Sequence, residues 1–370
     1  MIKKSFKDMH LSYLGMGNMR LPITDDGKGN IDYKKAEPMI DYAMKMGINY
    51  YDTAYTYHNK ESETFLGDVL SKYERSSYHL ATKFNIHAGT NYEEVFEEQL
   101  KKLQTDYIDF YLIHSLADST FQKYIDIGSV DWLIEQKKKG RIKHLGFSSH
   151  ASVKVLETFA DYTKWDFAQI QLNYFDWLYG TAKKEYEALR KRDIPIIVME
   201  PVRGGRLTQL TKESSVLLEK AHPDWSLAKW AFMWLKRLDG LKVILSGMSN
   251  LEQLEENIEI FSDEIALKDE DTKILLKSAK IHHSFVTVPC TGCGYCMDDC
   301  PSDINIPDFL TVYNKYKTDG LWHARREAQE IITKGLPIDC ISCGNCNNVC
   351  PQNIDVVSLM ELLSNLDIYQ

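Results

Sequence analysis

Cysteine is absent from the first 289 residues of this 370-residue chain, so that part must be stable without disulfides or bound metal. No apolar run approaches the ~20 residues of a membrane span, and the N-terminus lacks the apolar core of a signal peptide. There is no basic run and the net charge is −9, which gives nucleic-acid binding no electrostatic support. We expect a cytoplasmic globular protein.

All the cysteines lie in the last quarter of the chain, in two runs with the same spacing, each followed by proline. This Cys-x-x-Cys-x-x-Cys-x-x-x-Cys-Pro spacing is that of bacterial ferredoxins, in which three close thiolates hold one [4Fe–4S] cluster and the fourth ligates the other. The pattern predicts two crossed ligand sets: Cys290, Cys293, Cys296 and Cys350 for one cluster, and Cys340, Cys343, Cys346 and Cys300 for the second.

Disulfides and zinc are the alternatives for these cysteines. Disulfides are rare in the cytosol, and structural zinc sites close with four ligands, often in two separated pairs. Two four-cysteine runs that end in Cys-Pro fit iron better. Iron and acid-labile sulfide analysis decides between the three, with about eight of each per chain expected for two clusters.

Short apolar strands alternate with helical patterns before the cysteine runs. We expect strands at 11–17, 47–52, 79–83, 108–114, 142–148, 167–172, 194–199 and 243–246, and helices at 33–45, 62–72, 92–103, 130–139, 153–160, 183–190, 225–236 and 251–258. Such alternation implies parallel strands, and eight units close into a (β/α)8 TIM barrel. An open doubly wound sheet would favour a Gly-x-Gly-x-x-Gly turn, which Gly15-x-Gly17 does not continue.

The expected domains are a barrel at 1–262, a helical connector at 263–284 and a ferredoxin-type domain at 285–370. The 39 residues between Cys300 and Cys340 favour a mainly α-helical cluster domain, with helices at 309–316, capped by Asp308, and at 321–333. A last helix at 356–366 is expected to pack on the barrel. His282 and His283, at the end of the connector, are expected to face solvent.

Polar residues stand at the carboxyl ends of five expected strands. They are Asp52, Lys83, His114, Ser148 with Ser149, and Gln171 with Asn173, and Tyr57 follows Asp52 in the next loop. In a (β/α)8 barrel these ends meet at one rim, where active sites form. The sequence therefore predicts an active site at this rim.

Several motifs resemble those of the aldo/keto reductases. They are Asp52-Thr-Ala-Tyr-Thr-Tyr57, Ala81-Thr-Lys83, the Asp106–His114 strand, Gly140–Ser149 and Gln169–Tyr174. The resemblance runs from about residue 10 to residue 260. With the cysteine runs, the whole chain resembles the bacterial and archaeal members that carry a C-terminal [4Fe–4S] domain. The resemblance implies a catalytic tetrad of Asp52, Tyr57, Lys83 and His114.

Carbonyl reduction is the chemistry that these residue types allow. Hydride added to a carbonyl carbon leaves charge on oxygen, so a positioned proton donor is needed there. Tyr57 can serve if an adjacent cation, Lys83, lowers its pKa from the usual value near 10. Asp52 would hold Lys83, and His114 would orient the carbonyl or relay the proton.

The resemblance also implies a nicotinamide cofactor. Ser148, Ser149 and Gln171 would bind its carboxamide, and the loop 200–206 would pass the pyrophosphate. The segment after the eighth strand, with Gly247, Gln253 and Asn257, would clamp the nucleotide. Relatives that select NADPH commonly place Lys or Arg in this clamp, and here Gly247, Met248 and Gln253 are uncharged. NADH and NADPH both stay open, with Arg203 or Arg206 as substitute partners of a 2′-phosphate.

Two readings remain for the cluster domain. Its clusters would pass electrons to or from a ferredoxin or flavoprotein partner, or they would form a structural, docking or oxygen-sensing module on a stand-alone reductase. The first reading meets an obstacle, because a hydride carries two electrons and a cubane takes one, and the sequence shows no flavin signature. The rim residues Met19, Arg20, Tyr55, His58, Trp177 and Tyr179 are compatible with an aromatic or anionic carbonyl substrate.

Overall fold

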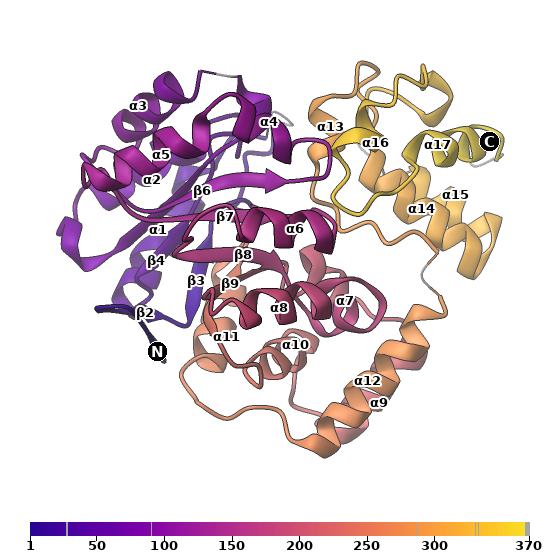
Figure 1. Cartoon of the computed structure of the whole chain (residues 1–370). Helices are drawn as coiled ribbons and strands as arrows, with labels where there is room; N and C mark the ends of the chain where they lie inside the picture. The colour runs from indigo at the N-terminus through magenta and orange to yellow at the C-terminus, as the bar shows by residue number, and fades with distance from the viewer. Residues whose placement is uncertain (27–28, 90, 286, 330, 332, 367–370) are drawn as a thin grey trace. The chain divides into compact units, whose positions relative to one another are not determined.

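The computed structural model describes residues 1–26, 29–89, 91–285, 287–329, 331 and 333–366 (Figure 1). The contacts of the chain divide it into two compact units. One comprises Met1–Pro201 with Ala231–Leu267, and the other Val202–Trp230 with Lys268–Gln370. Among the described residues, no helix combines the length and apolar character needed to cross a membrane.

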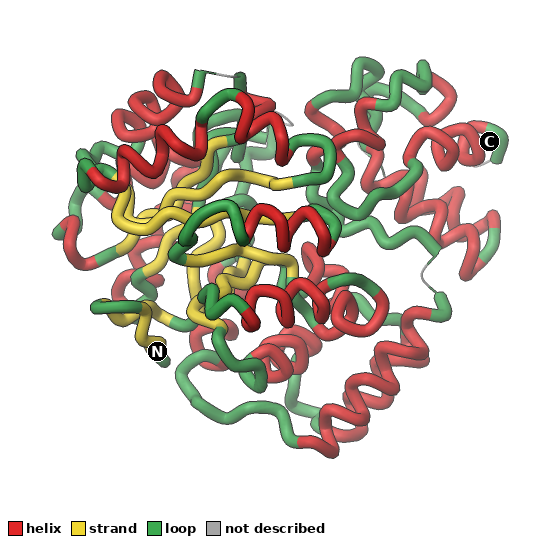
Figure 2. Tube along the Cα trace, in the orientation of Figure 1, coloured by secondary structure: helices red, strands yellow, loops and turns green. Residues whose placement is uncertain are grey.

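Eight parallel strands of the first unit close into a barrel, in the order β10-β3-β4-β5-β6-β7-β8-β9. They are β3 (Leu14–Gly17), β4 (Tyr50–Asp52), β5 (His79–Phe84), β6 (Ile108–Leu116), β7 (Ile142–Ser149), β8 (Phe167–Gln171), β9 (Ile196–Met199) and β10 (Leu241–Ser246). Figure 2 shows these strands in yellow among the red helices. The predicted TIM barrel is confirmed, and the open doubly wound sheet is excluded.

An antiparallel hairpin precedes the barrel, formed by β1 (Lys3–Phe6) and β2 (Met9–Ser12). Of the single strand predicted at 11–17, residues 14–17 are confirmed as β3, whereas Leu11 and Ser12 belong to the hairpin. Phe6 and Leu11 join the apolar core inside the barrel, and Lys7 pairs with Asp166, which directly precedes β8. The hairpin thus packs against the amino-terminal end of the barrel.

The helices that follow the barrel strands occur as expected, with two short additions, α4 and α7, and α10 crosses the boundary between the two units. They are α1 (Tyr33–Lys45), α2 (Ser62–Leu70), α3 (Tyr92–Lys102), α4 (Phe121–Asp126), α5 (Ser129–Lys138), α6 (Val153–Ala160), α7 (Tyr174–Tyr179), α8 (Ala182–Lys191), α10 (Leu227–Leu235) and α11 (Leu251–Ile260), with short 3-10 turns η1 (Arg75–Ser77) and η2 (Ile86–Ala88). Asp32, Asn91, Ser152, Asn173 and Asn250 cap helices through their side chains.

The second unit is helical in its described part, as predicted for residues 263–370, and it also contains α9, which was not predicted. Its elements are η3 (Arg203–Thr208), α9 (Lys212–Ala221), α12 (Asp269–His283), α13 (Tyr295–Asp298), α14 (Ile306–Asp319), α15 (Leu321–Gln329), η4 (Pro337–Asp339), α16 (Asn345–Val349) and α17 (Val356–Ser364). Residues 330 and 332 of the helix predicted at 321–333 lie outside the described residues. Helices α9 and α12 lie side by side (Figure 1), and Ser278 Oγ donates to the Ser214 carbonyl at 2.9 Å.

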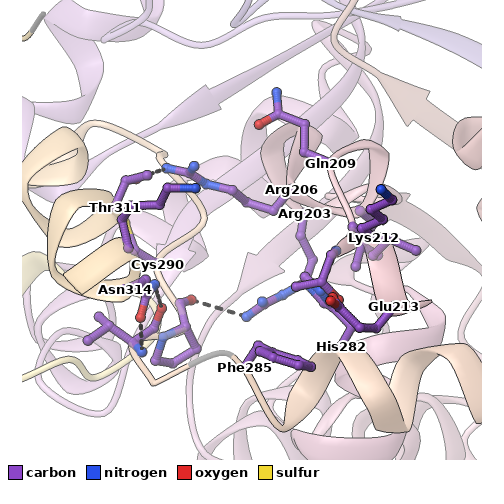
Figure 3. Close-up of a pocket in the computed structure, with 16 residues that line it drawn as sticks. Arg203, Arg206, Gln209, Lys212, Glu213, His282, Phe285, Cys290, Thr311 and Asn314 are labelled. Atoms are coloured by element: carbon purple, nitrogen blue, oxygen red, sulfur yellow. Dashed lines mark hydrogen bonds between the residues drawn. The ribbon is translucent and has the colours of Figure 1, made fainter. Parts of the chain in front are cut away.

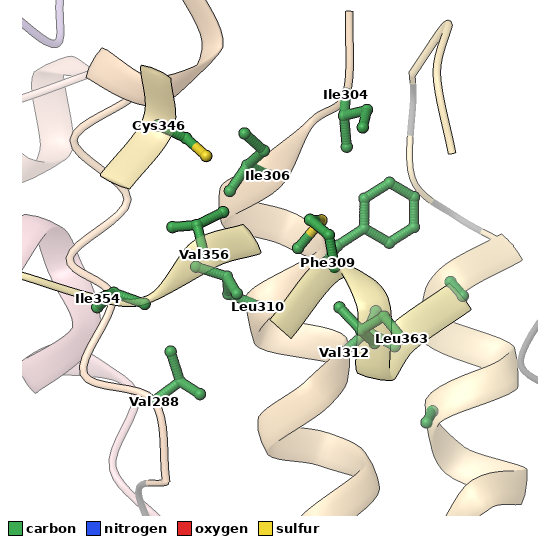
Figure 4. Packing of buried hydrophobic residues seen from close by; sticks show 13 residues of the cluster. Val288, Ile304, Ile306, Phe309, Leu310, Val312, Cys346, Ile354, Val356 and Leu363 are labelled. Atoms are coloured by element: carbon green, nitrogen blue, oxygen red, sulfur yellow. The ribbon is translucent and has the colours of Figure 1, made fainter. Parts of the chain in front are cut away.

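An apolar core holds the cysteine-bearing part of this unit together (Figure 4). Phe309 and Val312 of α14 are fully buried in it, as are Met360 and Leu363 of α17. Most of the cysteines pack in or against this core: Cys290, Cys296, Cys300, Cys340, Cys346 and Cys350. The prediction that the last helix packs on the barrel is therefore wrong, because the buried face of α17 packs into this core.

The predicted cap of α14 is also wrong. The helix begins at Ile306 after Asn305, so Asp308 lies inside the first turn and accepts a hydrogen bond from Asn305 Nδ2 at 2.8 Å. Pro307 allows this early start, because a proline in the first turn has no N–H to leave unpaired and its fixed φ suits a helix.

Candidate active site and cluster sites

Adjacent strands bring three of the expected residues to one rim of the barrel. Strand β4 ends at Asp52, which pairs with Ala81 of β5, and Lys83 lies two residues further along that strand. Strand β6 pairs with β5, with Leu112 opposite Lys83, and His114 lies two residues further along β6. Because these strands are parallel, their carboxyl ends lie side by side.

Lys83 is completely buried and bonded to its neighbours. Its Nζ donates to Asp52 Oδ1 at 2.6 Å and to the Thr53 carbonyl at 2.6 Å, and lies 3.4 Å from the Tyr57 hydroxyl. Burial lowers the pKa of Lys83 and raises that of Asp52, while the attraction between the two charges opposes both shifts. The ammonium group is therefore held in fixed contact with the phenol oxygen.

The loop after β4 places Tyr57 over this lysine. Lys83 Nζ is 4.9 Å from the centre of the Tyr57 ring, and the Tyr57 and His114 ring centres are 6.0 Å apart. His58, Asn59 and Lys60, which follow, have φ angles of 49°, 54° and 71°. Three successive non-glycine residues in this region carry backbone strain, a feature that concentrates in functional loops.

His114 is buried and has the environment of a neutral imidazole. Burial, with the nearby charge of Lys83, holds its pKa well below the usual value. Asn85 Nδ2 lies 3.4 Å from His114 Nδ1, and Asn85 Oδ1 accepts the His87 N–H at 2.9 Å. Because its oxygen is engaged by a donor, the amide presents its NH₂ group to the ring. We therefore assign the acceptor role to Nδ1 and the proton to Nε2.

A buried carboxyl group beside β5 was missed by the sequence reasoning. Glu63 Oε1 accepts from Thr82 Oγ1 at 2.5 Å and from Gln99 Nε2 at 2.7 Å, and Gln99 Nε2 also donates to the Lys83 carbonyl at 3.0 Å. Burial raises the pKa of Glu63 to about 7. The available signal was a charged residue three positions before Leu66, on the apolar face of α2.

The residues expected to bind nicotinamide lie at the ends of β7 and β8. Ser148 Oγ accepts the Ser115 N–H at 2.8 Å, and Ser149 Oγ accepts the Ala151 N–H at 3.2 Å. Gln171 Nε2 donates to Asp176 Oδ2 at 2.7 Å. These bonds hold the serines on β7, which pairs with the His114 strand β6, and Gln171 on β8, one strand further round the barrel.

The expected nucleotide clamp forms the start of α11. Gln253 Oε1 accepts the Ser249 N–H at 2.8 Å, and Asn257 Nδ2 donates to Ser246 Oγ at 3.0 Å. A Cβ atom at Gly247 would lie 3.2 Å from the Arg20 side chain, so this position leaves little space for a larger residue. A capped helix start after a barrel strand presents backbone N–H groups, which fits a phosphate-bearing cofactor.

Arg203 and Arg206, considered above as partners of a 2′-phosphate, contact the cysteine-bearing part of their own unit. Arg203 Nη2 donates to the Pro289 carbonyl at 3.1 Å, and Arg206 Nη2 donates to Thr311 Oγ1 at 2.8 Å. His282 accepts the Thr211 N–H at 3.3 Å and is partly buried, so the expectation that it faces solvent is wrong.

Two small cavities are each lined by four cysteines. One is lined by Cys290, Cys293, Cys296 and Cys350, and the other by Cys300, Cys340, Cys343 and Cys346. These are the two sets that the ferredoxin spacing predicts. Gly294 and Gly344, one residue after the second cysteine of each run, have φ angles of 85° and 78°, which favour glycine.

The thiols of the first cavity suit a cationic iron core. Burial raises the pKa of Cys296, and so do the nearby thiols Cys293 and Cys290, because thiolates this close repel one another when no metal is bound. In the part of the chain that the structure describes, no three His, Cys, Asp or Glu side chains converge closely enough for a single metal ion. The cysteines instead surround cavities, as the ligands of a four-iron cluster do.

Comparisons with known proteins match both parts of the chain. Residues 13–280 match the model of the aldo/keto reductase family, and residues 289–354 match that of a 4Fe-4S dicluster domain. The uncharacterized oxidoreductase YqkF of Bacillus subtilis is 26% identical over 75% of this chain and 96% of its own. The NADH-specific methylglyoxal reductase of Escherichia coli is 25% identical over 74% of this chain and 96% of its own.

Solved structures agree with the fold. The holo form of an aldo-keto reductase from Bacillus halodurans is 25% identical, with a TM-score of 0.63, and the match covers 75% of this chain and 96% of that one. An aldo-keto reductase from Klebsiella pneumoniae in complex with NADPH has a TM-score of 0.60 at 19% identity, over 76% of this chain and 96% of that one, which supports the fold alone. The chain belongs to the aldo/keto reductase family and carries a C-terminal 4Fe–4S dicluster domain.

Proposed function

We propose that the barrel is an NAD(P)-dependent carbonyl reductase in which Tyr57 is the proton donor. The observation that carries the proposal is the position of Lys83 Nζ, 2.6 Å from Asp52 Oδ1 and 3.4 Å from the Tyr57 hydroxyl. A buried ammonium in contact with a phenol favours release of the phenolic proton. This is the property required of a tyrosine that protonates a developing alkoxide.

Each residue then has one task. A bound nicotinamide supplies the hydride. Tyr57 donates its proton to the carbonyl oxygen as negative charge develops there, and Lys83 stabilises the phenolate that remains. His114 is neutral and, with its proton on Nε2, donates a hydrogen bond that orients the carbonyl. Asp52 holds the lysine in place.

Both forms of the cofactor are compatible with the clamp, and we propose that NADH is used at least as well as NADPH. Residues 246–257 contain no Lys or Arg. The Arg20 side chain packs beside Gly247, but its guanidinium lies 4.0 Å from Glu200, whose carboxylate competes with a 2′-phosphate for it. The Escherichia coli relative described as NADH-specific supports this preference.

We further propose that two [4Fe–4S] clusters occupy the cysteine-lined cavities and exchange electrons with a redox partner. The second cavity supports this role, because Cys343 is exposed and the neighbouring Ile338 and Ile341 are 69% and 67% exposed. Exposed apolar residues beside a cluster ligand are suited to docking another protein.

A structural role for the clusters is the second candidate. It is favoured by the packing of Cys346 inside the apolar core of the second unit, with Cys290, Cys300 and Cys350 packed against that core. Here cluster assembly would mainly stabilise the fold, as other structural metal sites do. The two candidates differ in whether the clusters change oxidation state when the barrel meets its cofactor.

The substitution Tyr57→Phe tests the reductase proposal. With methylglyoxal as the first probe and a panel of other aldehydes and ketones, kcat/KM should fall by a factor of about 10²–10⁴ in the variant. The matched control is Tyr73→Phe, which removes a hydroxyl that donates to Asp41 of α1. Iron content and circular dichroism should match wild type in both variants. A wild-type rate in Tyr57→Phe would remove Tyr57 from the mechanism.

A further inference from the structure

The second unit contains a cavity of about 630 Å³ that belongs to neither cysteine-lined site (Figure 3). Its walls come from the η3–α9 segment, the end of α12, the segment that leads to Cys290, and α14. The volume lies within the range of small-molecule sites, about 300–1,000 Å³. Gly247, Gln253 and Asn257 of the expected nucleotide clamp do not line it, whereas Arg203 and Arg206 of the loop expected to pass the pyrophosphate do.

The cavity is strongly basic in a protein with a net charge of −9. Among the described residues that line it, four are cationic, and Glu213 is the single carboxylate. The cations are Arg203, Arg206, Lys212 and Lys315. His282 adds no positive charge at neutral pH, because burial, with the charge of Arg203, lowers its pKa to about 4. A concave surface with this excess of positive charge attracts anions.

The arginines are held in place before any ligand arrives. Arg203 is 4% exposed and donates to the Pro289 carbonyl, and Arg206 donates to Thr311 Oγ1. Figure 3 shows both side chains reaching across from η3 toward these partners. A guanidinium carries five N–H donors, and the described hydrogen bond of Arg206 uses only its Nη2. Such preorganised donors suit the oxygens of a phosphate.

The remaining walls suit a larger, ring-bearing molecule. Phe285 gives an aromatic surface, Leu207 and Val288 are apolar, and Gln209 supplies an amide group. This combination of apolar walls with a few polar groups is typical of sites for organic ligands.

Cys290 also lines the cavity, and it is one of the proposed ligands of the first cluster. The Arg206 and Arg203 side chains line the same cavity, so their positive charges lie near this thiol. A bound anion would offset this positive field. Because local charge sets the reduction potential of an iron–sulfur cluster, an anion here makes the cluster harder to reduce.

We propose that this cavity binds a phosphate monoester of mononucleotide size, and that its binding lowers the reduction potential of the neighbouring cluster. None of the residues assigned a catalytic task above lines this cavity. A nucleoside monophosphate and a flavin mononucleotide share the required chemistry, an anionic phosphate joined to a planar ring.

Binding is measured on full-length protein that is purified anaerobically with its clusters, in a phosphate-free buffer. The probes for titration calorimetry are inorganic phosphate, AMP and FMN. AMP or FMN should bind more tightly than inorganic phosphate. The organic probe with the higher affinity shows whether the cavity prefers a purine or a flavin ring. Lys212→Gln and Lys315→Gln should each weaken binding about fivefold, as expected for loss of one partly exposed charge contact.

The matched controls lie on the same helices but outside the cavity. Lys220→Gln on α9 and Lys317→Gln on α14 each remove one exposed charge and should leave binding unchanged. In potentiometric EPR titrations, saturating ligand should shift one cluster to a lower potential in wild type and not in the Lys212→Gln/Lys315→Gln double variant. Failure of all three probes to bind, or equal weakening by cavity and control variants, overturns the site. Binding without a shift in potential overturns the coupling.

Discussion

At the scale of single residues, the surroundings of Lys83 decide what it can do. Its Nζ bonds to Asp52 and to the Thr53 carbonyl, and no part of the side chain is exposed. Removing the lysine would leave the Asp52 carboxylate buried without its cation, a change that typically costs about 3–5 kcal/mol. Tyr57 is the better residue for testing the chemistry, because Tyr57→Phe leaves this ion pair intact.

The second residue-scale prediction concerns the tautomer of His114. Asn85→Asp places a carboxylate where the amide now donates to Nδ1, so Nδ1 would gain the proton and Nε2 would become an acceptor. The carboxylate would also raise the pKa of His114, which burial now holds well below its usual value. We expect kcat/KM to fall at least about tenfold. The acidic limb of the pH profile of kcat/KM should move to higher pH by about one unit.

The sign of this effect follows from the need for a neutral imidazole. Activity is lost as pH falls through the pKa of His114, so in wild type the loss should begin well below pH 6.5, the usual value. Asn85→Ala is the control, since it removes the amide without adding charge. It should leave the acidic limb in place, and an equal shift in both variants would contradict the assigned role of Asn85.

At the scale of elements, the strand–helix alternation was enough to predict the barrel and the rim. Asp52, Lys83 and His114 could be placed together from sequence because each stands at a strand end and parallel strands end at one rim. The catalytic role of these residues stays a prediction, although the structure brings Lys83 into contact with both Asp52 and Tyr57.

Other elements could not be predicted, for physical reasons. Helices α4 and α7 have six residues each, too few turns to show a period. Strand β2 of the hairpin ends at Ser12 and β3 begins at Leu14, so the sequence shows one continuous apolar run where the structure has two strands. Asn85 acts on His114 through the orientation of its side-chain amide, and Arg203 donates to a carbonyl 86 residues away in the sequence. Neither contact leaves a local pattern in the sequence.

The network that joins α2, α3 and β5 gives a prediction on stability. Burial raises the pKa of Glu63 from 4.5 to about 7, so the folded state binds more protons than the unfolded state between these values. Stability should therefore fall as pH rises from 4.5 to 7 and then level off. The full effect of such a shift is about 3 kcal/mol. Glu63→Gln should remove this contribution and leave that of Glu185, whose pKa burial also raises to about 7. The variant should be more stable than wild type at pH 8.

Anaerobic urea unfolding at pH 5 and pH 8, followed by tryptophan fluorescence, measures this difference. Glu93→Gln, on the exposed side of α3, serves as the control and should keep the wild-type pH dependence. If Glu63→Gln and wild type lose the same stability between the two pH values, the buried carboxyl is not the titrating group.

At the scale of the whole molecule, the crossed cysteine sets make the two runs one folding unit. Cys300 lines a cavity with Cys340, Cys343 and Cys346, so Cys300→Ala should remove the cluster held by the second run and lower iron by about four atoms per chain. The domain boundaries at 262 and 284 stay a prediction.

Spectra of the surviving clusters identify which site was lost. Cys300→Ala should give the same EPR spectrum as Cys343→Ala, and Cys350→Ala the same as Cys293→Ala. If Cys300→Ala instead matches Cys293→Ala, each run binds its own cluster and the crossed assignment is wrong.

The central claim is that barrel and cluster domain form one redox enzyme. It is tested most directly by adding NADH, and separately NADPH, to the anaerobic protein and recording the broad cluster absorption near ~400 nm. A hydride carries two electrons and each cluster accepts one, so one NADH must reduce both clusters of a chain. The account predicts that this absorption bleaches without any added mediator and recovers with an oxidising partner. Full cluster colour throughout steady carbonyl reduction would contradict it and favour the structural role.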